Sequence, residues 1–179
     1  SMYSALMQLL CMRKLYRFLM FVGLLLAMQS IYAQSRYDKD KLYNVCPFKV
    51  LEKAIGYESG ASVVSLRPLS QSDKGQQWNI TELSGSFRLV NVFDDKALRA
   101  DIDHTEASVV PVNGSDEAQL WTIQKAGNFV RLIPANTPSL ILAYTDDGNL
   151  KLVKREEFGS EPITYIEFNG ANSSAWRYV

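Results

Sequence analysis

The hydrophobic and polar positions of this chain recur in three units after its first 41 residues. Each unit carries an apolar hexamer that ends beside a polar residue, followed by a polar loop, a β-branched run and, at its close, a tryptophan. The block Ala-Ser-Val-Val is identical at 61–64 and 107–110. A unit repeated about every 45 residues is typical of architectures built from copies of one supersecondary motif.

Short runs of β-branched and aromatic residues, separated by turn signals, predict an all-β protein. We expect strands over residues 42–46, 50–57, 62–66 and 77–82 in the first unit, 87–91, 97–100, 108–112 and 120–124 in the second, and 129–133, 141–144 and 150–153 in the third. The alternating run 163–168 predicts an additional strand in the third unit, which is longer than the others between 154 and 172. Four strands in each of three units, closed into a barrel with a cap of hairpins, remove free sheet edges.

The repeats define one domain, which we place at residues 42–179, after a flexible charged tail at 34–41. Its repeats span about residues 42–82, 86–124 and 128–179. We expect the closing tryptophans at equivalent core positions, because large rings bury much apolar area; they are Trp78, Trp121 and Trp176. Gln76 and Gln119 stand two residues before two of these rings, and an amide beside a buried ring needs hydrogen-bond partners.

The first 33 residues lie outside the repeats and have the pattern of a secretory leader, with its core at 12–33. Three basic residues (Arg13, Lys14, Arg17) precede the apolar run 18–28, and Ala33 is a small residue at the cleavage position. The run is short and interrupted for a membrane span, although an uncleaved anchor is the alternative. We expect cleavage, no membrane span in the mature chain, and a secreted or periplasmic protein.

The net charge limits the partners that the mature chain is expected to bind, and the cysteine content limits how its domain is held together. Loss of the leader leaves 16 basic and 19 acidic residues, a net charge of −3, without a basic stripe, so nucleic acid is not an expected partner. Cys46 becomes the one remaining cysteine and lies in an apolar run, which predicts a buried free thiol and a domain held by its core.

The three units carry hexamers such as the one that begins Lys-Ala-Leu, and they end in a tryptophan, two of them as Gln-x-Trp. In this pattern the chain resembles the ricin-type β-trefoil lectin domain over about residues 42–179. The resemblance implies a β-trefoil of three repeats with four strands each. It also implies carbohydrate binding without catalysis, in shallow pockets, at most one per repeat. Each such pocket uses an acid after the hexamer, an aromatic platform later in the repeat, and an asparagine beside the glutamine of Gln-x-Trp.

Carried onto this chain, the resemblance yields a partial set of sugar-binding groups. The acid position holds Asp101 in the second repeat, Glu58 in the first and Thr145 in the third, with Asp146 just beyond. The platform positions hold no aromatic residue, and Gly75 and Ala118 replace the asparagine. The candidates are Asp101, Asn113, Gln119, Glu58, Gln76 and Asp146. We rank the second repeat first, with Asn113 and His104 as further donors. Asp101 has a second interpretation, as a turn residue that bonds its own loop.

Other chemistry has little support in the sequence. His104 is the only histidine; it is either part of a metal or acid–base site or a solvated loop residue. Catalytic metal sites need several ligands of the histidine or cysteine type, and phosphate-loop and nucleophile-elbow motifs are absent. We therefore expect no enzyme, metal or cofactor. Two function classes stay open: a carbohydrate-binding module with a glycan partner, and a protein-interaction or inhibitor-like trefoil that acts through loops such as 154–172.

Overall fold

The computed structural model describes residues 12, 14, 37–48, 50, 52–126, 129–145, 148–158 and 166–170. By its contacts the chain divides into two units, Ser1–Arg36 and Tyr37–Val179, and all strands described below belong to the second. No helix among the described residues is long and apolar enough to cross a membrane.

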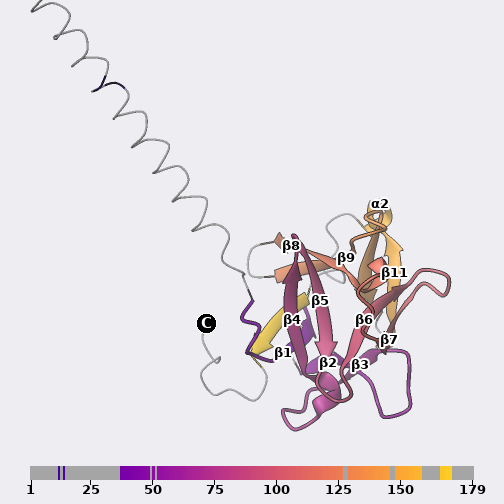
Figure 1. Ribbon diagram of the computed structural model, residues 1–179. Helices are drawn as coiled ribbons and strands as arrows, with labels where there is room; N and C mark the ends of the chain where they lie inside the picture. Colours follow the sequence, from indigo (N-terminus) through magenta and orange to yellow (C-terminus); the bar gives the residue numbers. More distant parts are fainter. Residues whose placement is uncertain are drawn as a thin grey trace, which may run out of the picture. The chain divides into compact units, whose positions relative to one another are not determined.

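The strands follow the threefold repeat of the sequence (Figure 1). The first repeat holds β1 (Tyr43–Pro47), β2 (Lys53–Gly56), β3 (Ser65–Pro68) and β4 (Trp78–Leu83). The second holds β5 (Ser86–Asn91), β6 (Lys96–Asp101), β7 (Glu106–Pro111) and β8 (Trp121–Ala126). The third holds β9 (Phe129–Pro134), β10 (Leu140–Tyr144), β11 (Leu150–Lys154) and β12 (Ile166–Gly170). The described helices are single turns: η1 (Lys74–Gln76), η2 (Glu117–Gln119) and α2 (Arg155–Phe158).

Six of these strands close into a ring. Antiparallel pairing runs from β4 to β1, β12, β9, β8 and β5, and then back to β4. In Figure 1 the yellow strand near the end of the chain accordingly lies beside the indigo β1. The remaining strands form the hairpins β2–β3, β6–β7 and β10–β11, one per repeat. A six-stranded barrel with three hairpins is the β-trefoil architecture, which confirms the fold implied by the family resemblance.

Strand register corrects the sequence prediction for the third repeat. Trp78 opens β4 opposite Asn91, the last residue of β5, and Trp121 opens β8 opposite Pro134, the last residue of β9. The equivalent residue of β12 is Ile166, which opens that strand opposite Pro47. The run 163–168, predicted as an additional strand, therefore overlaps the fourth strand of the repeat. Trp176, which the sequence analysis assigned to this position, lies outside the described residues.

The two equivalent tryptophans anchor the core. Both are fully buried, with 0% exposure. The Nε1 of Trp78 donates to the carbonyl oxygen of Ile55 at 3.0 Å, and the Nε1 of Trp121 donates to that of Leu98 at 2.9 Å. Each ring thus ties the barrel to the second strand of its own repeat. Replacing such a ring with alanine costs about 3–5 kcal/mol. Cys46 is also buried, as expected.

The segment before β1 differs from the flexible tail predicted at residues 34–41. Its described part begins at Tyr37, which is 8% exposed and stacks edge-on against Tyr43 and Phe87. The amide of Asp38 donates to the Tyr43 hydroxyl at 3.0 Å. The charged residues that suggested a tail stay at the surface, whereas the aromatic ring among them has an apolar place to pack.

Candidate functional site at the hairpin tips

The Gln-x-Trp glutamines organise two equivalent loops. The Nε2 of Gln119 donates to the Pro111 carbonyl oxygen at 3.0 Å and to Asp116 Oδ2 at 3.3 Å. Its Oε1 accepts from the backbone N–H of Asn113 at 3.0 Å. Gln76 makes the same three bonds in the first repeat, to Pro68, Asp73 and Ser70. Both glutamines are 1% exposed. The side-chain amides of these two sugar-site candidates are therefore occupied by hydrogen bonds within their own loops.

Backbone hydrogen bonds join the three hairpins at one end of the protein. Val109 donates to the Ser62 carbonyl at 2.7 Å, which links the β6–β7 hairpin to the loop before β3. Leu152 in β11 donates to the Thr105 carbonyl at 2.8 Å. Leu66 in β3 donates to the Gly148 carbonyl at 3.1 Å. Each hairpin is thereby fixed by both of the others, so that their turns form one rigid surface.

A cavity of about 230 Å³ opens between these turns. Its walls come from all three repeats: Val63, Val64, Ser65, His104, Thr105, Glu106, Asn149, Leu150 and Lys151. Val63 is 42% exposed and supplies apolar surface, while Glu106 and Lys151 supply charges of opposite sign. No phenylalanine, tyrosine or tryptophan side chain is among the described residues that line it.

Asp101, at the end of β6, lies beside this cavity in a cluster with His104 and Glu106. The Oδ2 of Asp101 lies 3.0 Å from the Nδ1 of His104, and the His104 amide donates to Oδ1 at 3.3 Å. Asp101 stands directly opposite Glu106 in the β6–β7 register. One potential ligand atom from each of the three residues lies within 4.8 Å of the others, the one such group found among the described residues. The His104 side chain is 72% exposed and that of Asp101 is 21% exposed.

The cluster is electrostatically coupled. The hydrogen bond and the negative charge of Asp101 raise the pKa of His104 above its ordinary value, and Glu106 and Asp103 act in the same direction. Burial acts to raise the pKa of Asp101, but hydrogen bonds from His104 outweigh it and lower that pKa. The pair therefore favours the ionised form of Asp101 and the protonated form of His104. The bond of Asp101 to the His104 amide also matches the turn-residue interpretation.

The other sugar-site candidates lie apart from this cluster. Glu58, the first-repeat equivalent of Asp101, is 73% exposed and pairs with Arg67 at 2.8 Å. Asn113 is exposed in the loop before η2, where its Oδ1 accepts from Ser115. Within the described residues no hydrogen bond joins Asp101 to Asn113 or to Gln119. Asp146 lies outside the described part of the chain.

Four polar residues of the cavity were not singled out by the sequence analysis: Ser65, Thr105, Glu106 and Lys151. A signal for Glu106 was present. A hairpin that turns over residues 102–105 must place residue 101 opposite residue 106. The contributions of Asn149 and Lys151 depend on the packing of the third hairpin against the second, which no local pattern encodes.

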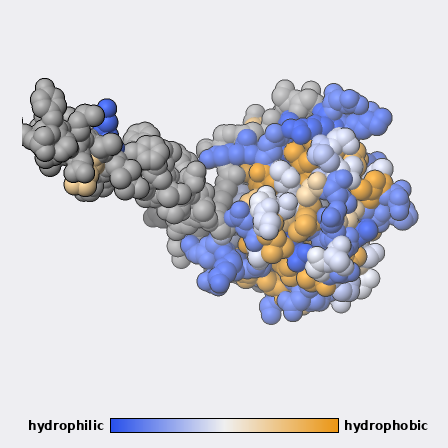
Figure 2. All heavy atoms as spheres, turned by 45° about the horizontal axis from the view of Figure 1, so that its top comes forward, coloured by the Kyte–Doolittle hydropathy of each residue, from blue (hydrophilic) through white to orange (hydrophobic). Residues whose placement is uncertain are grey.

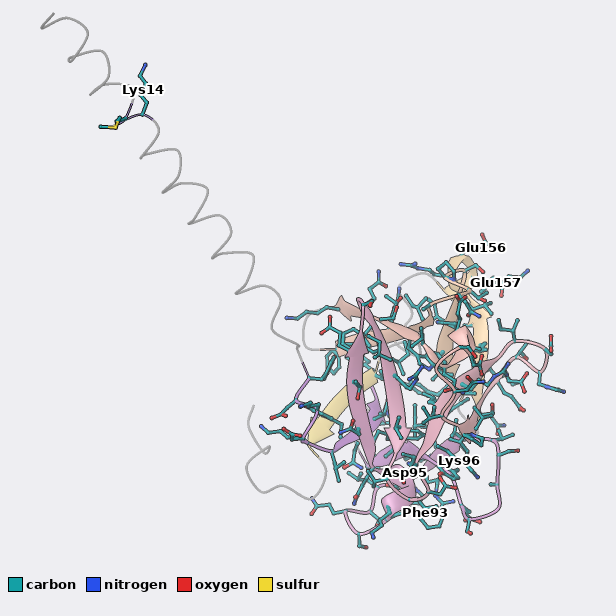
Figure 3. The ribbon with its side chains drawn as sticks, viewed as in Figure 1. Lys14, Phe93, Asp95, Lys96, Glu156 and Glu157 are labelled. Carbon is teal, nitrogen blue, oxygen red and sulfur yellow. The ribbon has the colours of Figure 1, made fainter. Side chains whose placement is uncertain are left out.

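A second surface feature lies at the turn between β5 and β6. Phe93 is 44% exposed and meets the buried ring of Tyr57 edge-on, with centroids 6.2 Å apart. The Tyr57 hydroxyl donates to Asp94, which also pairs with Lys96 at 3.0 Å. Burial, and then the bond to Asp94, raise the pKa of Tyr57 well above its ordinary value. Figure 3 shows Phe93, Asp95 and Lys96 together at this turn. Among the phenylalanine, tyrosine and tryptophan side chains whose exposure the structure describes, Phe93 is the exposed one.

Comparisons with known proteins agree with the architecture. Residues 74–151 match the model of the family described as ricin-type beta-trefoil lectin domain-like. A search of curated proteins finds no match.

Solved structures with the same fold include a designed threefold symmetric protein, ThreeFoil. It is 18% identical, has a TM-score of 0.61, and is aligned over 72% of this chain and 98% of its own. The Polyporus squamosus lectin, solved with a human-type influenza-binding epitope, is 11% identical with a TM-score of 0.60, over 75% of this chain and 50% of its own.

An endo-β-galactosidase from Clostridium perfringens is 13% identical with a TM-score of 0.65, over 73% of this chain. This chain spans only 32% of that enzyme. At such identities the three likenesses show the fold alone. The family match over residues 74–151 and the threefold architecture together show a β-trefoil that is similar to ricin-type, lectin-like domains.

Proposed function

We propose that this protein is an exported, non-catalytic glycan-binding module, and that the cavity at the hairpin tips is its binding site. The observation that carries the proposal is the charged cavity between three mutually bonded hairpins in a ricin-type trefoil. Lectin-like trefoils support a carbohydrate ligand, and the Polyporus protein among the structural neighbours is a lectin.

The chemistry of the walls suits a sugar. A pyranose offers hydroxyl groups that need fixed acceptors and donors, and carbon faces that need apolar contact. Asp101 and Glu106 accept, Lys151 and protonated His104 donate, and Val63 gives apolar surface. The volume of about 230 Å³ is below that of drug-sized pockets, which suits a single terminal sugar residue.

Binding to a glycan array identifies the sugar, and two matched variants then test the site. Hydrogen bonds to a charged group contribute about 1.5–3 kcal/mol, so we expect Asp101→Asn to weaken binding about tenfold or more. Glu58→Gln is the control, since Glu58 is the first-repeat equivalent of Asp101 but does not line the cavity, and its replacement should leave binding unchanged. Equal, negligible losses in both variants, with an intact near-ultraviolet circular dichroism spectrum, would refute the site.

Export is the second element of the proposal and rests on the leader. The basic cluster, apolar run and Ala33 are the sequence features that support it. We expect the intact mass of the exported protein to correspond to a chain that begins at Gln34. Retention of residues 12–33 in the exported protein would contradict cleavage.

A protein-interaction or inhibitor-like role is the second candidate. It is favoured by the lack of a phenylalanine, tyrosine or tryptophan among the described cavity residues, and by apolar side chains exposed on turns, Phe93 at 44% and Ile102 at 38%. Figure 2 shows apolar residues gathered in the middle of one face, with polar residues around them. If no glycan binds, a purified protein partner whose binding is weakened by Phe93→Ser and spared by Asp101→Asn would establish this role.

A further inference from the structure

We propose that Asp101, His104 and Glu106 form a binding site for a divalent first-row transition cation of the Zn²⁺ type at the tip of the β6–β7 hairpin. The sequence analysis expected no metal, because a single histidine is a weak signal. The structure adds the two carboxylates that the turn brings to that histidine. The inference concerns the cation alone and stands whether or not a glycan binds.

Distances in the cluster fit a metal ion. Bonds from zinc to nitrogen and carboxylate oxygen measure about 2.0–2.2 Å. The His104 Nδ1 and Asp101 Oδ2 atoms, 3.0 Å apart, would each reach a common ion at such distances with an angle of about 90° between the bonds. In a tetrahedral site the same bond lengths place two donors about 3.4 Å apart. All three ligand atoms lie within 4.8 Å of one another, so binding an ion would require side-chain rotation that draws the three donors together.

The charge pattern also favours a cation. Asp101 and Glu106 are directly opposed across an antiparallel pair, where like charges destabilise the sheet. His104 offsets them only while it is protonated, and Asp103 adds a further negative charge near it. On the positive side, Arg99 acts on Asp101, although it pairs with Asp116 at 3.0 Å, and Lys151 lines the cavity. A bound divalent ion would compensate both opposed carboxylates at once.

The donor set selects the class of ion. Calcium takes six to eight oxygen ligands, whereas an imidazole nitrogen with two carboxylates suits zinc, cobalt, nickel or manganese. Three protein ligands leave a coordination position open, as in zinc sites that hold a water molecule or a substrate oxygen. Because His104 and Glu106 both line the cavity, that open position would face it.

The single histidine makes the test specific. In the untagged full-length protein, the imidazole proton resonances come from His104 alone. We expect Zn²⁺ to shift or broaden these resonances in a saturable titration with one ion per chain by calorimetry. Zinc bound by a thiol elsewhere would leave them unmoved. Calcium at the same concentration should have no effect.

Variants then assign the ligands. We expect His104→Gln, Asp101→Asn and Glu106→Gln each to weaken zinc binding at least tenfold, and Glu58→Gln to leave it unchanged. Thermal unfolding and circular dichroism establish that each variant is folded, and the wild-type resonance titration needs no variant at all. Unmoved His104 resonances at millimolar zinc would overturn the proposal. So would unchanged affinity in all three variants, or an equal response to calcium.

Discussion

Replacing Gln119 with alanine should destabilise the protein by about 3 kcal/mol, because one side chain closes the whole loop from Pro111 to Trp121. The substitution removes two bonds from Nε2, at 3.0 and 3.3 Å, and one to Oε1, at 3.0 Å. A typical hydrogen bond contributes about 0.5–1.5 kcal/mol net, and a buried group left without a partner costs about 1–3 kcal/mol.

Water limits the loss, since Pro111 and Asn113 are exposed and the carbonyl and amide that lose their partner can be hydrated. The side chain itself is 1% exposed, so its removal also leaves a cavity beside Trp121. Because these two effects oppose each other, we expect the loss of unfolding free energy to lie near the middle of the range that three such hydrogen bonds would contribute. Urea denaturation followed by tryptophan fluorescence measures it, because Trp121 and Trp78 are buried and report on unfolding.

Two matched variants make the reasoning testable. Gln76→Ala removes the same three bonds from the first repeat and should cost a similar amount. Gln77→Ala removes one side-chain bond, to the Gln71 carbonyl at 2.8 Å, and should cost clearly less. If Gln119→Ala costs under about 0.5 kcal/mol, the net value of a single ordinary hydrogen bond, the glutamine does not hold the loop.

Three further outcomes are expected. Gly75→Ala should destabilise by about 1–3 kcal/mol in urea denaturation, because the added Cβ would lie 2.3 Å from the Tyr57 carbonyl oxygen; a neutral result would mean that η1 shifts freely. Ile166→Ala should cost about 2–5 kcal/mol, since Ile166 is 3% exposed at the position equivalent to the two tryptophans, and a surface-like loss would show that β12 is not packed in this register. The His104–Asp101 pair raises the pKa of His104, so its contribution to stability is present below the ordinary pKa of about 6.5 and is lost as pH rises through the raised value. Thermal unfolding against pH should show this decline in the wild type, whereas His104→Gln should flatten it.

The fold could be predicted from the sequence because the patterns that determine it are local and are repeated along the chain. The strands around Ala54, Ala97 and Ile141 carry short apolar runs that recur from one copy to the next. The prediction failed where one copy departs from the others. Ile166 fills the place of a tryptophan without the preceding glutamine, so the search for Gln-x-Trp passed over β12 and settled on Trp176.

The candidate site could be predicted only in part, because its residues come together through tertiary packing. Asp101 was singled out from the resemblance, and His104, named there as a further donor, does lie beside it. Glu106, which stands opposite Asp101, was not predicted, and within the described residues the predicted Asn113 and Gln119 make no hydrogen bond to Asp101. Gln119 was assigned two roles at the sequence level, and its burial fits the structural one. Residues of the third hairpin reach the cavity only because three turns bond to one another.

The order of strands around the barrel has a consequence for how the protein folds. The hairpins β4–β5 and β8–β9 join neighbouring segments and can form early. The pairing of β1 with β12 instead joins Tyr43 to Gly170, so the barrel closes only after the last described strand has been synthesised. Until then β1 and β9 each present an unpaired edge, which is a template for association with other chains. Long-range closure of this kind makes folding slow and places the risk of aggregation in the interval before the chain is complete.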